Sequence, residues 1–261
     1  MNKGAIFLTA FWMYCFYPAW AKSAEDDLAL DIIRQSDHVR SPNKPFRYTV
    51  TVLEYRSGIK EPVKRQVLDV SMRFLKPEGG QTADARSLAR FVFPLRDRGK
   101  VLFSDWYDLW FYTPELRRPI PVSRQQRLLG QISNGDVVVT NFEFAYNPIL
   151  MSDEPCGVSQ CYSLVLTRKS PEVTYPKVIY LIEKESYRPF KASYFSLDDK
   201  PIKEVEYLDY KPLLGRDRPS KIKVTHPRQG DNYSIMEYSD VRFESLPLSN
   251  FTKEYIQRGG K

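Results

Sequence analysis

Cys156 and Cys161 are the pair whose spacing predicts a chemical bond most clearly. Four residues lie between them, in a turn region that contains proline and glycine and joins two apolar stretches. In an exported chain, an even pair of this kind is typical of a disulfide that closes a hairpin loop. The alternative is a redox-active pair, but the spacing is not C-x-x-C and no thioredoxin-like βαβ pattern surrounds it. We therefore expect a structural disulfide.

Residues suited to catalysis or to metal binding are few and scattered. The 261 residues include three cysteines and the two histidines His38 and His226, too few for a zinc or haem site or for a Cys/His or Ser/His catalytic pair. The sequence has no G-x-S-x-G elbow, no G-x-G-x-x-G or Walker loop and no H-E-x-x-H. We expect no enzyme activity, no metal and no cofactor; an unrecognised hydrolase is the alternative.

The N-terminus has the layout of a secretory signal peptide. Lys3 is followed by a short apolar run, and an A-x-A-type site that ends at Ala21 precedes a polar segment. The apolar run is short for a membrane span, although an uncleaved anchor remains the alternative. We expect residues 1–21 to be a signal peptide cleaved after Ala21, so that a single domain over residues 22–261 is exported to the periplasm.

Beyond this segment the dominant hydrophobic period is two. Phe46, Tyr48 and Val50 alternate with polar residues, which predicts a strand with one buried face. The same pattern predicts about eleven antiparallel strands at hairpin spacing, and thus a mainly β protein. They are expected at residues 46–52, 68–74, 88–93, 101–103, 106–112, 162–167, 178–183, 190–197, 202–210, 221–225 and 233–243. Helices are expected only at residues 24–36, 123–130 and 250–257.

The chain is rich in aromatic residues, with 17 Tyr, 15 Phe and 4 Trp. A surplus of this size needs either a large core or an apolar ligand. Because the few helices are too short to cover a large sheet fully, we expect a cavity or groove for hydrocarbon. Its candidate lining is Tyr48, Val50, Val52, Leu68, Val70, Met72, Phe74, Phe91, Phe93, Trp110 and Tyr112. A sealed core would produce the same alternation, so that alternative stays open.

The most distinctive stretch is residues 105–120, where an aromatic strand ends at a proline and is followed by Arg117 and Arg118. The pattern W-x-Y-x-P…R-R…R-L-x-G…S-N-G-D, which ends at Asp136, resembles the LolA-like outer-membrane lipoprotein-sorting protein family, in its exported branch. Further matching segments are EPC at 154–156, VTYP at 173–176, YRP at 187–189 and M-x-YSD at 236–240. The resemblance covers nearly all of the chain after the predicted signal peptide.

The resemblance implies an open, incomplete antiparallel β-barrel of the LolA, LolB and RseB type, with short helices over an apolar concave face. It implies a periplasmic carrier or chaperone that binds acyl chains of a lipid or lipoprotein in an apolar groove. The carrier would hand them between membrane components toward the outer membrane, without catalysis. Arg117 and Arg118 are candidates for contact with a lipid head group or an acidic partner; as loop charges they could equally be solvated and inert.

Related proteins of this branch are often paired with RND/MMPL-type lipid exporters, so the resemblance implies an inner-membrane transporter of that type as a partner. The alternatives are a periplasmic sensor or interaction module of the RseB type, or an accessory subunit of an RND-type transporter without free cargo transfer. The formal charge of +7 is spread over turns and polar faces, which disfavours a nucleic-acid partner. We expect a monomer.

Overall fold

Regular alternation of apolar and polar residues gives most of the chain an extended conformation. The computed structural model describes residues 19–42, 44–75, 84–138 and 141–259. Within these residues, one antiparallel sheet contains 14 strands and a separate hairpin contains two. The fold is mainly β, as the alternation predicts.

All eleven predicted strands are present, most of them longer than predicted. They are β1 (Phe46–Tyr55), β2 (Lys64–Leu75), β3 (Asp84–Phe93), β4 (Val101–Asp105), β5 (Asp108–Tyr112), β11 (Ser159–Arg168), β12 (Lys177–Glu183), β13 (Pro189–Phe195), β14 (Pro201–Leu213), β15 (Arg216–Thr225) and β16 (Tyr233–Phe243). The additional strands are β6 (Ile120–Pro121), β7 (Arg127–Leu129), β8 (Ile132–Ser133), β9 (Tyr146–Leu150) and β10 (Glu154–Cys156). Four of these five strands have only two or three residues, too few for a period of two to be recognised.

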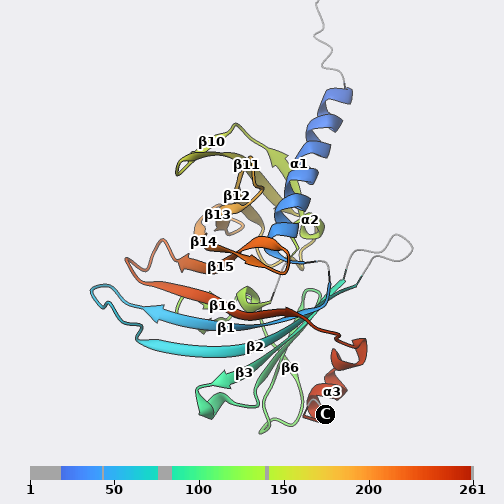
Figure 1. Cartoon of the computed structure of the whole chain (residues 1–261), viewed down its shortest axis with the longest axis vertical. Coiled ribbons are helices and arrows are strands. Elements are labelled where there is room, and N and C mark those ends of the chain that lie inside the picture. Colours follow the sequence, from blue (N-terminus) through green and yellow to red (C-terminus); the bar gives the residue numbers. More distant parts are fainter. Residues whose placement is uncertain (1–18, 43, 76–83, 139–140, 260–261) are drawn as a thin grey trace, which may run out of the picture.

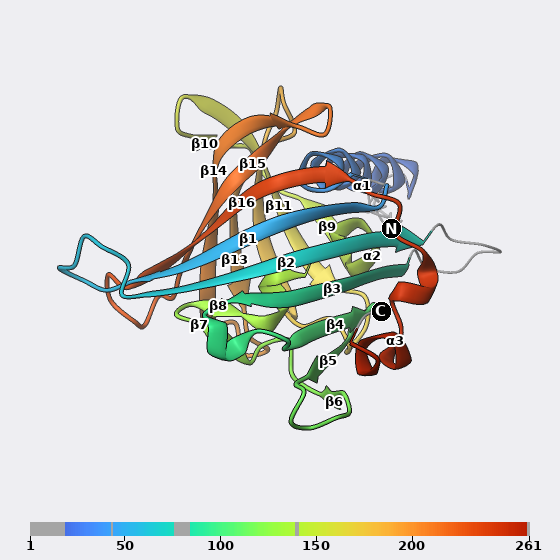
Figure 2. The same ribbon diagram turned by 60° about the horizontal axis from the view of Figure 1, so that its bottom comes forward.

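The large sheet is a meander that places the first strand in its middle. Its order is β10-β11-β12-β13-β14-β15-β16-β1-β2-β3-β4-β5-β6, with β9 also paired to β11. Every pairing in it is antiparallel, and β1 lies between β16 and β2. Figures 1 and 2 show that the sheet bends strongly without its two end strands meeting. This is the open, incomplete barrel that the family resemblance implies.

Helix α1 (Ala19–Arg40) packs against β9, β13, β15 and the short helix α2 (Phe142–Ala145). Ala29, Ile32, Ile33 and Ser36 are at most 1% exposed and lie on one face, at the spacing of an amphipathic helix. The helix continues to Arg40, past its predicted end at residue 36, and its buried face becomes polar there: Asp37 is 5% exposed, and the Ser36 hydroxyl lies 2.9 Å from the Tyr180 hydroxyl. An apolar period alone could not mark that continuation.

The helix predicted at residues 123–130 is wrong. Residues 127–133 form the β7–β8 hairpin, preceded by a turn in which the Ser123 hydroxyl accepts a hydrogen bond from the Gln125 amide at 3.2 Å. Gly130 has a φ of 54° and makes the turn of the hairpin instead of ending a helix. Leu128, Leu129 and the fully buried Ile132 pack on the main core, so the hairpin fills part of the concave face.

A second, smaller core lies on the opposite face of β3 and β4. Its buried members are Leu88, Val101, Phe103, Leu246, Phe251 and Ile256. The C-terminal helix α3 (Lys253–Gln257) covers it, and the Thr252 hydroxyl caps this helix by accepting a hydrogen bond from the Tyr255 amide at 3.1 Å. The helix predicted at residues 250–257 is therefore present in shortened form, because its cap lies at Thr252.

The predicted disulfide between Cys156 and Cys161 is confirmed. It joins β10 to β11 at the end of their hairpin, and the two Cα atoms lie 5.8 Å apart. Both cysteines are at most 2% exposed. The bond therefore stabilises a local hairpin at one end of the large sheet.

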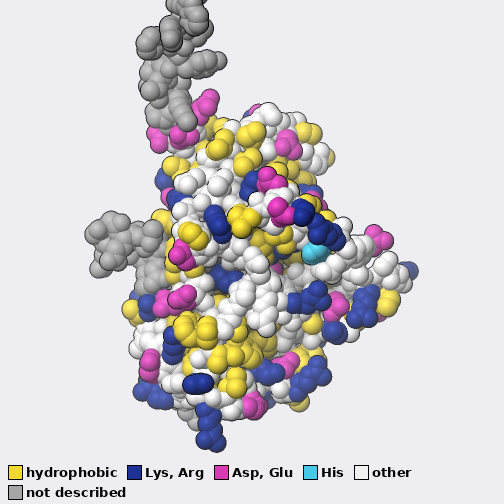
Figure 3. All heavy atoms as spheres, turned by 180° about the vertical axis from the view of Figure 1, so that it is seen from behind, with side chains coloured by type: hydrophobic (Ala, Val, Ile, Leu, Met, Phe, Trp, Pro, Cys, Tyr) yellow, Lys and Arg dark blue, Asp and Glu magenta, His cyan; other side chains and the backbone are white. Residues whose placement is uncertain are grey.

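Residues 1–18, which carry most of the predicted signal peptide, lie outside the described residues, so the cleavage after Ala21 stays a prediction. Within the described residues, no helix has the length and apolar character needed to cross a membrane. Figure 3 shows lysine and arginine side chains dispersed among aspartate and glutamate on one face of the molecule. On this face the basic residues are not gathered into a single stripe.

We predict that replacing both Cys156 and Cys161 by serine will weaken the fold without abolishing it. The disulfide closes a loop of only a few residues, and loop-closure entropy then gives it about 2 kcal/mol of unfolding free energy. Urea unfolding followed by tryptophan fluorescence would measure the loss. A double variant that has no β signal in circular dichroism would contradict a local role.

We predict that Gly130→Ala will destabilise the protein more than Gly215→Ala. Both glycines have positive φ, so both variants carry backbone strain. A Cβ at position 130 would lie 2.3 Å from the Ser234 hydroxyl, whereas a Cβ at position 215 meets nothing within 4 Å. The additional overpacking should cost about 1–3 kcal/mol in thermal or urea unfolding. Equal stability of the two variants would show that the hairpin does not pack as described.

Candidate functional site

A cavity of about 150 Å³ lies between the bent sheet and the segments that cover its concave face. Strands β1 and β13 to β16 form the sheet wall, and the end of α1, the helix α2 and the segments around residues 135–138 and 173–175 complete it. Aromatic side chains are the main component of the wall. Its tyrosines, among the described residues, are Tyr48, Tyr107, Tyr146, Tyr175, Tyr194, Tyr207 and Tyr238.

The strand tyrosines reach the cavity because of the period of two. On β14, Val205 and Tyr207 both face inward, and on β16 Met236 and Tyr238 do so. Burial raises the pKa of Tyr48 and Tyr207 above the ordinary value, so their hydroxyls stay protonated at neutral pH. The Tyr48 hydroxyl donates a hydrogen bond to the backbone carbonyl of Val137 at 3.1 Å. The tyrosine part of the wall is therefore uncharged, and the hydroxyl of Tyr48 is fixed by its hydrogen bond.

Lys203 is a buried cation beside the cavity. It forms an ion pair with Asp136, whose carboxylate also accepts a hydrogen bond from the Ser133 amide at 2.8 Å. The Lys203 ammonium lies 4.6 Å from the ring centre of Tyr175 and 4.9 Å from that of Tyr194. Burial opposes its charge, but Asp136 and Tyr175 outweigh burial and raise the pKa of Lys203. Lys203 is therefore charged at neutral pH.

Arg124 is a second buried cation of the same cluster. Its Nη1 donates to the Ser104 hydroxyl at 3.0 Å and to the Trp106 carbonyl at 3.1 Å. Burial lowers the pKa of Arg124, while the nearby Asp136 opposes the shift. Both Arg124 and Asp136 line the cavity, while Lys203 lies behind Asp136 and pairs with it.

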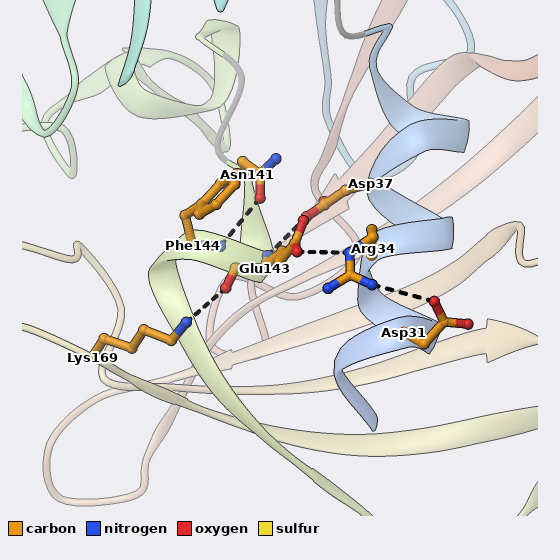
Figure 4. Close-up of polar contacts among 7 residues, drawn as sticks. All are labelled: Asp31, Arg34, Asp37, Asn141, Glu143, Phe144 and Lys169. Atoms are coloured by element: carbon orange, nitrogen blue, oxygen red, sulfur yellow. Dashed lines mark hydrogen bonds and ion pairs between the residues drawn. The ribbon is translucent and has the colours of Figure 1, made fainter. Parts of the chain in front are cut away.

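Polar contacts join α1 to α2, as Figure 4 shows. The Arg34 Nε donates to Glu143 Oε1 at 2.8 Å, and the Glu143 amide donates to Asp37 Oδ2 at 2.8 Å. Asn141 caps α2, because its side-chain oxygen accepts a hydrogen bond from the Phe144 amide at 3.2 Å. We call Arg34, Asp37 and Glu143 the α1–α2 latch. It holds two parts of the cavity cover together.

Arg40 connects the latch to the cavity. Its Nη1 donates to Asp37 Oδ1 at 2.9 Å, and its guanidinium carbon lies 4.1 Å from the ring centre of Phe142. Burial raises the pKa of Asp37 to about 6, although the charge of Arg40 opposes this shift. For Arg40, burial opposes the charge, but Tyr207, Tyr180 and Asp37 together raise the pKa, so its guanidinium stays charged.

Arg218, on β15, caps the C-terminal end of α1. Its Nη1 donates to the carbonyls of His38 at 2.7 Å and Val39 at 2.9 Å, and its Nε donates to the Leu213 carbonyl at 3.0 Å. Cations are favoured at this end of a helix because the last carbonyls lack partners within the helix. Arg218 is 6% exposed and also lines the cavity.

Cations outnumber carboxylates around the cavity. Among the described residues, Arg40, Arg124 and Arg218 line it, whereas Asp136 is the only acidic residue that does. Lys203 and Asp37 contact these groups without lining the cavity themselves. The excess of positive charge therefore persists when the groups behind the wall are included.

The structure brings one of the eleven predicted lining residues, Tyr48, into the cavity wall. Six others are sealed in the main core at no more than 6% exposure: Val50, Val52, Leu68, Val70, Met72 and Phe91. Phe74 is half-buried and packs against the same core. These residues belong to strands β1 to β3, of which only β1 contributes described residues to the cavity wall. Their predicted contact with lipid stays a prediction.

The remaining predicted residues lie outside the cavity wall. Phe93 is 44% exposed at the end of β3, and Trp110 and Tyr112 pack against the small core under α3. Trp110 also lines a shallow pocket beside β5 that shares Tyr107 and Arg124 with the cavity. Arg117 and Arg118 are exposed in the loop between β5 and β6. Contact of the two arginines with a head group or partner stays a prediction.

Sequence reasoning missed the charged residues of the site. Lys203 had a visible signal, because it lies in phase with Val205 and Tyr207 on the inward face of a predicted strand. Arg124 and Asp136 had no signal of this kind. Asp136 pairs with Lys203 although the two lie far apart in the sequence, and only the topology of the fold brings such residues together.

The described residues offer binding chemistry more readily than reaction chemistry. No group of three His, Cys, Asp or Glu side chains among them could hold a metal ion. The half-buried His38 has its pKa lowered, first by burial and then by the charge of Arg216. An aromatic wall with buried cations can bind apolar chains and anions.

Comparison with known proteins gives three similar solved structures. A LolA superfamily protein from Nitrosomonas europaea has 29% identity and a TM-score of 0.76, over 87% of this chain and 98% of that chain. A DUF1329 family protein from Desulfovibrio piger has 19% identity and a TM-score of 0.75, over 89% and 99% of the two chains. A domain assigned as an outer membrane lipoprotein-sorting protein, from Vibrio parahaemolyticus, has 20% identity and a TM-score of 0.73, over 89% and 100%.

Comparison by sequence gives less information than comparison by structure. Residues 83–258 match the model of a family described as an uncharacterized protein. No curated protein matches the chain. At 20% identity or less, the second and third structures show similarity of fold, whereas the first is also similar in sequence.

We predict that Asp136→Asn will destabilise the protein by about 3 kcal/mol, because it leaves Lys203 and Arg124 without their shared carboxylate. The matched control is Asp198→Asn, which removes an exposed ion pair with Lys200 and should leave stability unchanged. Adding Lys203→Met to Asp136→Asn should recover part of the loss in a double-mutant cycle. Independent effects of the two substitutions would contradict the described cluster.

Proposed function

Because the chain belongs to the LolA-like family, we propose that it is a periplasmic carrier or chaperone for acyl chains of a lipid or lipoprotein. In this proposal the chains lie in the tyrosine-lined cavity and pass between membrane components toward the outer membrane. The role is one of binding and transfer, without catalysis. The proposal includes export of the chain, with the signal peptide removed after Ala21.

The observation that carries the proposal is the cavity between β13–β16 and the α1–α2 cover. An amphipathic cover over an aromatic wall can move without breaking the ladders between strands, because α1 is tied to β12 and β15 by side-chain hydrogen bonds of Tyr180 and Arg218. Tyr194, Tyr207 and Met236 offer apolar surface from three different strands. A hydrocarbon chain would find contacts along the full width of this wall.

The cavity is too small to hold a diacyl cargo in the closed structure. At about 150 Å³ it is comparable to an apolar cavity that accepts one benzene-sized molecule. A diacyl cargo is much larger, so in this proposal the α1–α2 cover moves when cargo enters. The side chains of Arg34 and Glu143 in the latch are 46% and 19% exposed, so breaking their ion pair costs only about 0–1 kcal/mol.

The partner in this proposal is a membrane component that donates or accepts cargo, such as an inner-membrane transporter of the RND/MMPL type, and the carrier acts as a monomer. A periplasmic sensor of the RseB type, or a transporter subunit without free cargo transfer, would differ in one measurable respect. Either would associate stably with a membrane partner without carrying lipid.

We predict that the full chain, exported to the periplasm and purified without detergent, will contain phospholipid or another acyl lipid when extracted and analysed by mass spectrometry. It should also bind a fluorescent fatty acid. Val241→Trp, at a half-buried position of the cavity wall, should weaken this binding roughly tenfold by filling space. The matched control is Leu197→Trp, which adds the same side chain at a site that is 78% exposed.

An empty protein that binds no fatty acid would contradict the carrier role. Co-purification with an inner-membrane protein in the absence of any lipid would instead support the sensor or subunit alternative. Equal loss of binding in Val241→Trp and Leu197→Trp would place the bound chain outside the cavity.

A further inference from the structure

Arg218 is a buried cation whose hydrogen bonds do not neutralise it. Its Nε and Nη1 donate only to backbone carbonyls, those of Leu213, His38 and Val39. Among the described residues, its Nη2 has no hydrogen-bond partner and no carboxylate lies within ion-pair distance of it. Nη1 caps α1 and Nε donates to the end of β14, so these bonds account for two of its three nitrogens.

The surroundings of Arg218 are apolar on the cavity side. Leu213, Leu214 and Pro219 line the cavity beside it, from β14, β15 and the turn between them. A charged guanidinium among such groups is costly unless an anion or a set of acceptors meets it. Burial and the nearby Arg216 lower the pKa of Arg218 to about 10, which still leaves it charged at neutral pH.

The other charges of the cavity reinforce this imbalance. Arg40 lines the cavity and has Asp37 as its carboxylate, while Arg124 and Lys203 share Asp136. Each described carboxylate beside the cavity is thus engaged by another cation. An additional anion in the cavity would meet Arg218 without displacing an existing ion pair.

We propose that Arg218 forms an anion subsite inside the apolar cavity, so that the preferred ligand is an amphiphile with a carboxylate or phosphate head and a hydrocarbon chain. The head group accepts hydrogen bonds from the Arg218 guanidinium, and the chain lies on the aromatic wall formed by residues such as Tyr207 and Tyr238. The inference rests on the proposed carrier function, because it specifies the class of cargo for the same cavity.

The geometry suits an amphiphile better than a free ion. A free phosphate would have to leave water for a wall made mainly of tyrosine, valine and leucine side chains, with one unpaired cation to compensate. An amphiphile gains from burial of its chain as well as from the charged hydrogen bond. Charge-assisted hydrogen bonds of this kind typically change affinity by roughly tenfold to a hundredfold.

The test compares three ligands that share one chain and differ in the head: hexadecanoate, hexadecyl phosphate and the neutral hexadecanol. Each displaces a fluorescent fatty acid from the full chain, and inorganic phosphate alone serves as a fourth competitor. We expect the wild type to bind one or both anionic amphiphiles at least roughly tenfold more tightly than hexadecanol. The preferred anion identifies the head group as carboxylate or phosphate.

Arg218→Met keeps an unbranched apolar side chain at this position and removes the guanidinium with its charge. We expect it to bind the three amphiphiles with similar affinity, so that the preference for the anionic heads is lost. Arg218→Lys should retain part of the preference, and the control Arg216→Met, at an exposed arginine of the same strand, should retain all of it. Hexadecanol binding by Arg218→Met also shows that the cavity is intact despite the altered cap on α1.

Equal affinity of the wild type for all three amphiphiles would overturn the subsite and leave the carrier function standing. The same holds if Arg218→Met keeps the full preference, or if inorganic phosphate alone displaces the probe. Failure of all three amphiphiles to bind the wild type would overturn the carrier function itself, and the subsite with it. The wild-type comparison decides the question even if Arg218→Met does not fold.

Discussion

The structure depends on keeping the concave face of an open, strongly bent sheet out of water. The sheet does not close on itself, so its inward side chains must be covered by other parts of the same chain. The β7–β8 hairpin covers the part near β1, and α1 with α2 covers the part near β13 to β15. The cavity lies under the second cover, in which Arg218 ties α1 to β15 through its side chain and α2 continues directly into β9.

The two covers explain why one part of the concave face is sealed core while another part borders a cavity. Val50 and Leu68 meet the apolar residues of a hairpin and become fully buried core. Tyr194 and Tyr207 meet the end of a helix that carries Asp37 and Arg40, and the polar groups there prevent a close-packed apolar contact. The cavity is the space left where a polar helix end lies over an aromatic wall.

Much of the fold was predictable from the sequence. Long strands such as β14 and β16 have enough alternating residues to be recognised, and the buried face of α1 is visible in its spacing. The helix prediction at 123–130 was wrong because Leu128 and Leu129 belong to a hairpin, and this hairpin is stabilised by packing against distant strands. Local periodicity carries no information about such contacts.

The site was less predictable than the fold, for a related reason. A period of two separates the inward from the outward face of a strand, but it does not say which cover lies over that face. Val70 and Tyr207 both point inward, and only the topology decides that one is sealed and the other borders a cavity. Lys203 was the exception, since a lysine in phase with apolar neighbours indicates a buried polar cluster from sequence alone.

For a carrier, the strength of binding matters less than the balance between loaded and empty states. Cargo entering the cavity gains about 0.8 kcal/mol for each methylene removed from water. Moving the cover exposes residues such as Ile32, Ile33 and Phe142, which are at most 2% exposed when it is closed. The cost of opening is therefore of the same kind as the gain from binding and grows with the area uncovered. In the proposed carrier, a cover made of apolar side chains on a polar latch would offset one against the other, so that cargo could be released as well as held.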